Sequence, residues 1–320
     1  MNKLLLILGF VVSLHPTVAA QDVASDLCDV PVVVADYNNQ LVRNLTPADF
    51  SVRLAGSPAP IASVSLDAGP KRLALVLDAS SNVPDEEWKL GTDMAAEFVK
   101  HARPNDQFAL LIIGGSPTSG AFSSSADIVA RLQRLQGARP KSEDNERIYD
   151  ALLDAANLFD PPQFGDTIFL FGHHKDSGSK TSLNQLQDLL LTGRSRFFGM
   201  SFADRLAGLP PGVDLNKPLP KEFRSAQLET LSADTGYFFS FHSVQSLGIS
   251  GQLPLFEDFL SDLYTWIAEP YRLRLSTSSF DHGSSFEISV TEMEARKIHR
   301  SGIHYPHSVN PCGKQAPKAP

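Results

Sequence analysis

The feature that most constrains the fold is an uninterrupted apolar run that ends in an aspartate. Residues 73–77 contain no polar side chain, and Asp78 follows them directly, before a short polar loop that includes Ser80 and Asn82. A run of this length bounded by turn residues is typical of a strand that is buried on both faces, as in a parallel sheet. In open α/β sheets, ligands bind just beyond the carboxyl ends of such strands. The loop after residue 77 is therefore the first place to expect a binding site.

The chain repeats this rhythm of strand and helix over most of its length. Further strands are expected at residues 108–113, 167–171, 196–202, 237–241 and 271–275, and helices at residues 84–101, 126–135, 148–159, 182–192, 222–233 and 255–268. Such alternation predicts an α/β fold, with a doubly wound, mainly parallel sheet that carries helices on both faces.

Both ends of the chain show a different pattern, in which apolar and polar residues alternate. Short strands are expected at residues 31–35, 50–54, 286–290 and 298–305, and the last two have no helices to pack against. We therefore expect the two ends to pair into one small β-sandwich-like domain. The expected division is a signal peptide at 1–20, an N-terminal β segment at 21–68, the α/β domain at 69–270, the completing C-terminal strands at 271–308 and a disordered tail at 309–320.

The first twenty residues have the features of a secretory signal. Lys3 precedes an apolar stretch at residues 4–14, and the small residues Val18 and Ala20 lie just before the expected cleavage point at Gln21. No other segment approaches the length of a membrane span. We expect an exported protein, periplasmic or secreted, with no stable membrane span after cleavage; the alternative is that the N-terminal segment is retained as an anchor.

The net charge and the cysteine content indicate which partners and which cell compartment to expect. The net charge of −8 and the scattered lysines and arginines argue against nucleic acid as a partner. The two cysteines, Cys28 and Cys312, lie near opposite ends of the folded region. In an oxidising compartment they are expected to form a disulfide that closes nearly the whole mature chain, for which chain entropy gives roughly 5 kcal/mol. The alternative is a bond between Cys312 and a second molecule.

Several segments, taken in order, resemble one protein family. They are residues 32–36, residues 45–50, the loop 78–82, residues 148–152, residues 176–182, residues 235–236 and residues 271–273. Their order and spacing resemble the VWFA-related domain proteins of acidobacterial type, in which a von Willebrand factor A-like domain carries a flanking β domain. The resemblance implies an exported protein that is not an enzyme and that acts in protein–protein recognition or cell adhesion.

The resemblance also implies a metal-ion-dependent adhesion site, in which oxygen ligands from three loops hold Mg²⁺. The first loop keeps Asp78 and Ser80, while Asn82 replaces a second serine. In the second loop Glu146 stands where the family has threonine, and in the third His173 stands where it has aspartate. Because imidazole is a poor ligand for Mg²⁺, we expect a degenerate site with no cofactor, at which Mg²⁺ is the ion to test.

The face expected to contact a protein partner consists of Asp78, Glu146, His173 and Asp176. Other interpretations remain open at this point: a transition-metal site that uses His173 with its neighbour His174, a structural scaffold subunit of a cell-envelope complex, and a cryptic hydrolase that pairs Ser80 with His173. The proline-rich loop at residues 203–221 is expected to be either a partner contact or a passive insertion.

Overall fold

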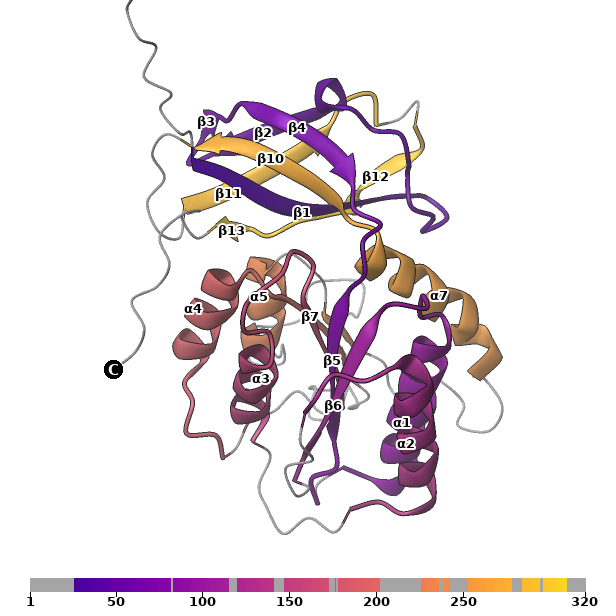
Figure 1. Cartoon of the computed structure of the whole chain (residues 1–320). Coiled ribbons are helices and arrows are strands. Elements are labelled where there is room, and N and C mark those ends of the chain that lie inside the picture. The colour runs from indigo at the N-terminus through magenta and orange to yellow at the C-terminus, as the bar shows by residue number, and fades with distance from the viewer. Residues whose placement is uncertain are drawn as a thin grey trace, which may run out of the picture.

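The computed structural model describes residues 26–81, 83–114, 120–140, 147–172, 176, 178–201, 226–235, 239–241, 253–277, 284–293 and 296–309. These residues form two parts, an antiparallel β sandwich and an α/β part, which Figure 1 shows one above the other. A linker from the last N-terminal strand of the sandwich leads into the first strand of the α/β part.

The α/β part is built on a parallel sheet. In the described residues its order is β6-β5-β7-β8-β9, and every neighbouring pair is parallel. The strands are β5 (Arg72–Asp78), β6 (Gln107–Ile113), β7 (Thr167–Gly172), β8 (Arg196–Ser201) and β9 (Phe239–Phe241). The fold class predicted from the alternation of strands and helices is confirmed.

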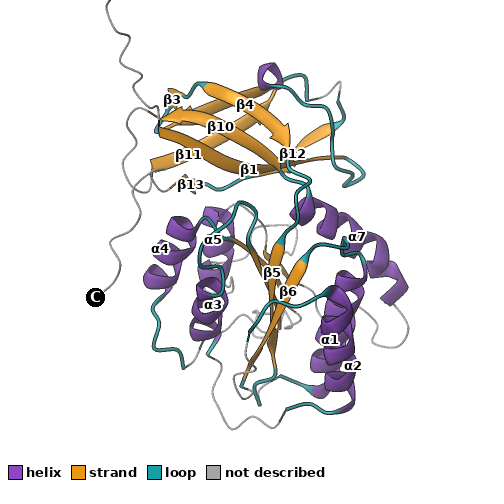
Figure 2. Cartoon of the chain, viewed as in Figure 1, coloured by secondary structure: helices purple, strands orange, loops and turns teal. Residues whose placement is uncertain are grey.

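Helices cover both faces of this sheet, as Figure 2 shows. One layer contains α1 (Asp85–Lys100), α2 (Ser125–Gly137) and α7 (Leu253–Ala268), and the other contains α3 (Ile148–Asn157), α4 (Leu183–Gly193) and α5 (Ala226–Thr235). Successive side chains of a strand point to opposite faces, so Leu75 and Leu77 pack with the first layer while Ala74 and Val76 pack with the second. Burial on both faces explains why this strand is apolar throughout.

The sandwich consists of two antiparallel sheets contributed by both chain ends. One has the order β12-β1-β10-β4 and the other β13-β11-β2-β3. Their strands are β1 (Asp26–Asp36), β2 (Phe50–Leu54), β3 (Ser57–Pro58), β4 (Ile61–Leu66), β10 (Tyr271–Thr277), β11 (Ser284–Val290), β12 (Ile298–His304) and β13 (Ser308–Val309). The expected pairing of the two chain ends is confirmed, because β1 lies between β10 and β12.

The structure corrects the sequence analysis at several strands. The strand expected at residues 31–35 extends over Asp26–Asp36, and the strands β3, β4 and β13 were not anticipated. In β1, Val32 and Val34 face the sandwich core, whereas Val33 and Ala35 belong to the core shared with α1 and α7. Burial on both sides explains the length and continuity of this strand.

Buried charged groups lie at the amino end of the parallel sheet. The Arg196 side chain, 1% exposed, donates to the carbonyl oxygens of Gly165 at 2.9 Å and Ile267 at 2.5 Å. Arg72 forms a two-point ion pair with Asp166 at 2.9 and 2.6 Å. In Figure 1 the sandwich lies at the amino end of this sheet, and the carboxyl ends of the strands lie at the opposite end of the molecule.

Two further sequence expectations concern the chain termini. Cys28 lies in β1, and its side chain is buried, with 4% exposed. Cys312 and the signal segment lie outside the described residues, as does all of the tail at 309–320 except residue 309. The disulfide bond and the signal cleavage therefore stay predictions. Among the helices that the structure describes, none has the length and apolar character needed to cross a membrane.

Candidate functional site

The first loop of the candidate site begins where β5 ends. Asp78 is 2% exposed, and its Oδ1 accepts the backbone N–H of Ser80 at 3.0 Å, which closes a tight turn. Ser80 is fully buried, and its Oγ has no hydrogen-bond partner among the described residues. A buried hydroxyl without a partner is uncommon in native structures and calls for an explanation. The loop thus presents a buried carboxylate and a buried, unsatisfied hydroxyl two residues apart.

The end of β7 lies directly against this aspartate. A Cβ atom at Gly172 would stand 2.3 Å from the Cβ of Asp78 and 3.3 Å from its backbone nitrogen. No side chain fits in that space, so glycine is required where the two strand ends meet. The close approach fixes the backbone of Asp78 against the neighbouring strand.

An arginine that the sequence analysis did not identify braces the same loop. Arg139 donates through Nη1 to the carbonyl oxygen of Val83 at 2.7 Å and to Asp85 Oδ1 at 2.9 Å. Its Nη2 donates to the carbonyl oxygens of Ala79 and Ser80. One guanidinium therefore binds three carbonyl groups of the loop and places a positive charge beside the candidate site. No local sequence pattern predicts this role, because Arg139 lies some 60 residues from the loop it contacts.

Asp176, predicted as part of the partner face, stabilises a helix end. Its Oδ1 accepts the backbone N–H of Tyr149 at 3.2 Å and the hydroxyl of Ser179 at 2.6 Å, and its Oδ2 accepts the backbone N–H of Ser179 at 3.3 Å. The residue before α3, Arg147, provides no side-chain cap, so Asp176 acts as the cap from another loop. Both of its oxygens are already engaged.

Asp150 makes the reciprocal contact from the first turn of α3. It accepts the backbone N–H groups of Lys180 and Thr181 at 3.1 and 2.9 Å, and its own N–H donates to Ser179 Oγ at 3.0 Å. Burial raises the pKa of Asp150, but the hydrogen bonds from Thr181 and Lys180 outweigh burial and hold it below the usual value. Burial and the nearby Asp176 charge raise the pKa of Tyr149 to about 12.

The structure thus brings together only some of the predicted site residues. Asp78 and Ser80 lie at one strand end, and Asp176 lies at the start of α3, where it serves the backbone. Asn82, Glu146 and His173 lie outside the described residues. Within the part of the chain that is described, no group of three or more histidine, cysteine, aspartate or glutamate side chains is placed to hold a metal ion.

Comparison with known proteins gives a likeness of fold. No protein-family model and no curated protein matches the chain. Among solved structures, a von Willebrand factor type A protein from Catenulispora acidiphila matches at 11% identity and a TM-score of 0.44, over 74% of this chain and 50% of that one. The mussel byssus proximal thread matrix protein 1, solved with a zinc-occupied MIDAS motif, matches at 17% and 0.47, over 66% and 49%.

A third match is the conserved hypothetical protein BatB from Bacteroides thetaiotaomicron, at 16% identity and a TM-score of 0.39, over 62% of this chain and 99% of that one. The chain spans about half the length of the first two structures. The acidobacterial type named from the sequence stays a prediction. The parallel sheet and its two helix layers give this chain a doubly wound α/β fold.

Proposed function

We propose that this chain is an exported, non-enzymatic protein that recognises another protein through the strand-end face, defined here as the surface around Asp78, Ser80 and Asp176. The observation that carries the proposal is the unsatisfied Ser80 hydroxyl beside the Asp78 carboxylate. The face lies at the end of the sheet that the sandwich leaves open (Figure 1). Ligands of α/β sheets bind at this end.

A hard cation fits the first loop in part. The Asp78 carboxylate and the free Ser80 hydroxyl are oxygen donors of the kind that Mg²⁺ prefers, and a bound cation would supply a positive charge for a carboxylate of the partner. Two features oppose tight binding. The Arg139 guanidinium already binds the loop carbonyls, and both Asp176 oxygens are engaged. We propose weak cation binding at most, through Asp78 and Ser80.

Site-specific cross-linking tests the recognition role in the native host. A photo-reactive amino acid at the exposed Ser81, next to the face, should give discrete adducts with another protein, and one at the exposed Ser51 of β2 should not. The Ser81 adducts should disappear in Asp78→Ala and decrease in Ser80→Ala. They should persist in Asp188→Ala, which removes an exposed aspartate from the middle of α4. Adducts that form equally from both positions, or that survive Asp78→Ala, contradict the proposal.

The same experiment distinguishes the alternative of a scaffold subunit. An inert strand-end face in an envelope complex predicts adducts from the sandwich position and none from Ser81. The hydrolase alternative pairs the Ser80 hydroxyl, as nucleophile, with His173. Ester hydrolysis by the purified protein that is lost in Ser80→Ala would favour that alternative.

Export has its own test. N-terminal sequencing of the protein recovered outside the cytoplasm should begin at Gln21, after cleavage behind the small residues Val18 and Ala20. Recovery of an uncleaved chain in the membrane fraction would favour the retained anchor, and recovery in the cytoplasm would contradict export.

A further inference from the structure

Three loops of the strand-end face are connected by groups of the protein itself. In the described residues, the first loop comprises 78–81 and 83 after β5, the second comprises 147–150 at the start of α3, and the third comprises 176 and 178–182 before α4. In the adhesion site that the sequence resemblance implies, a cation connects three such loops through their oxygen atoms. In this chain, hydrogen bonds from side chains to the backbone make connections of the same kind.

Arg139, which follows α2, holds the first loop. Its guanidinium donates to the carbonyl oxygens of Ala79, Ser80 and Val83. The guanidinium also lies over the ring of Trp88 of α1, with 5.9 Å between its Cζ and the ring centroid. A guanidinium presents its donors in a rigid plane and is always charged. The three loop carbonyls therefore already have a permanent cationic partner.

The second and third loops hold each other through two aspartates. Asp176 of the third loop accepts the backbone N–H of Tyr149 at 3.2 Å. Asp150 of the second loop accepts the backbone N–H groups of Lys180 and Thr181 at 3.1 and 2.9 Å. Because these bonds run in both directions, neither loop can move away without breaking hydrogen bonds to the other.

The first loop is packed against the strand that leads to the third loop. A Cβ atom at Gly172, the last residue of β7, would stand 2.3 Å from the Cβ of Asp78. Packing this close leaves no room for one strand end to shift alone. The described parts of all three loops are therefore held in place through protein groups.

The two aspartates that connect the loops have little capacity left for a cation. Asp176 accepts the Ser179 hydroxyl at 2.6 Å and the Ser179 backbone N–H at 3.3 Å, in addition to its bond from Tyr149. A cation that used Asp176 or Asp150 as a ligand would first have to displace such donors, and hydrogen bonds to charged groups are the strong ones. The Ser80 hydroxyl, in contrast, has no partner among the described residues.

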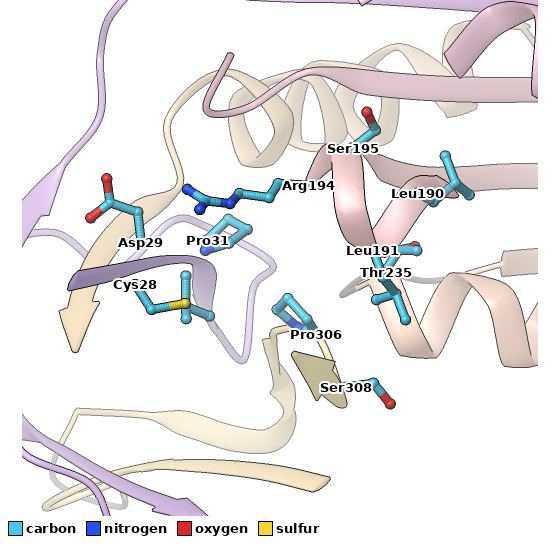
Figure 3. A pocket seen from close by; sticks show the side chains of 11 residues that line it. Cys28, Asp29, Pro31, Leu190, Leu191, Arg194, Ser195, Thr235, Pro306 and Ser308 are labelled. Carbon is cyan, nitrogen blue, oxygen red and sulfur yellow. The ribbon is translucent and has the colours of Figure 1, made fainter. Parts of the chain in front are cut away.

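A hollow between β1 and the ends of α4 and α5, shown in Figure 3, does not compete with this face as a binding site. Its cavity volume of about 40 Å³ is far below the roughly 300–1,000 Å³ of ligand pockets. The Arg194 guanidinium and the Ser195 hydroxyl point in different directions in Figure 3, so these two donors do not converge on one group.

We propose that recognition at the strand-end face requires no divalent cation, because Arg139, Asp150 and Asp176 fix its loops in place of one. Arg139 acts as a positioning residue that holds the carbonyl groups of the first loop and leaves the Ser80 hydroxyl for the partner. The statement about recognition rests on the function proposed above, whereas the fixing of the loops can be measured without a partner.

Amide hydrogen exchange of the full mature chain tests whether the loops need a cation. The amides to follow are those of Ser80, Val83, Tyr149 and Thr181, which donate within or between the loops. A cation with submillimolar affinity for the loops would slow their exchange by more than roughly tenfold at about 10 mM. We expect the rates in EDTA and in about 10 mM Mg²⁺ to agree within about twofold. Slowing by tenfold or more would overturn the proposal.

Arg139→Gln isolates the contribution of the arginine. It should speed the exchange of the Ser80 and Val83 amides by at least roughly tenfold, while the Leu170 amide in the middle of β7 keeps its rate and shows that the fold is intact. Arg139→Lys, which keeps the charge without the planar donors, should lie between this variant and the wild type, and it provides the test if Arg139→Gln does not fold. Arg134→Gln, which removes an exposed arginine from α2, should change no rate. Wild-type rates in both Arg139 variants would overturn the proposal.

Cross-linking from Ser81, repeated in a lysate of the native host with and without EDTA, tests the recognition itself. The adduct yields should agree within about twofold, and they should fall at least roughly tenfold in Arg139→Gln but not in Arg134→Gln. Loss of the adducts in EDTA would overturn the proposal. Absence of adducts in both buffers contradicts recognition at this face altogether, and the exchange rates then still decide how the loops are held.

Discussion

Replacing Gly172 by alanine is the sharpest test of how the strand-end face is built. The added Cβ would lie 2.3 Å from the Cβ of Asp78, 3.3 Å from its nitrogen and 3.4 Å from its Cα. The backbone at Gly172 has a φ of +153°, which L side chains rarely adopt. The first contact lies far inside van der Waals distance and involves an atom next to the backbone, so one of the two strands must shift.

The expected cost follows from these two contributions. Overpacking of a tight site costs about 1–3 kcal/mol, and an unfavourable backbone conformation adds about 1–3 kcal/mol. We expect Gly172→Ala to lower the free energy of unfolding in urea by about 2–4 kcal/mol, with an unchanged dependence on denaturant concentration. Gly137→Ala is the matched control, because a Cβ there meets nothing within 4 Å. It should be neutral or slightly stabilising.

A double-mutant cycle identifies the contact responsible. Asp78→Gly removes the atom that the new Cβ would strike, so Gly172→Ala should cost at least about 1 kcal/mol less in that background than in the wild type. A Gly172→Ala cost below about 0.5 kcal/mol, or an equal cost in both backgrounds, would refute the reasoning.

Three further predictions follow from the candidate site, the chain ends and the domain boundary. Calorimetry should show no submillimolar affinity for Mg²⁺, and a tight stoichiometric heat that is lost in Asp78→Ala would contradict this. Mass spectrometry of the mature protein without reductant should show one Cys28–Cys312 bond, and two free thiols or a covalent dimer would exclude it. Burial lowers the pKa of His304 from 6.5 to about 4, so the unfolded chain takes up a proton before the folded one. Stability is then lost as the pH falls through this range, by at most about 3 kcal/mol; His304→Phe, which keeps an aromatic ring against Trp266, should remove this contribution.

Much of the fold could be predicted because its strands are buried on two faces. The apolar run before Asp78 and the run in β7 show continuous hydrophobicity that only a covered parallel sheet explains. The sequence of β4 shows no such continuous hydrophobic run. It is the edge strand of its sheet, its residues 61–66 alternate small and polar side chains, and Ser63 and Ser65 are exposed. A strand that is half exposed at an edge has little sequence constraint, so its identity depends on the partner strand β10.

The candidate site was predictable only where its contacts are local. The turn between Asp78 and Ser80 joins residues two positions apart, so the local sequence is enough to predict it. The brace from Arg139 and the helix cap from Asp176 connect segments about 60 and 27 residues apart. Such contacts depend on how α2 and α3 pack on the sheet, which a single sequence does not state. The sequence analysis therefore placed Asp176 on the partner face without anticipating its hydrogen bonds to Tyr149 and Ser179.

One buried polar group at the carboxyl end of the parallel sheet is not satisfied. The Ser80 hydroxyl has no hydrogen-bond partner among the described residues. An unsatisfied buried polar group costs about 1–3 kcal/mol, and proteins tolerate such local inconsistencies mainly at functional sites. A ligand atom or partner side chain that hydrogen-bonds Ser80 would recover that free energy on binding. That recovery is the physical reason for proposing that binding takes place at the carboxyl end.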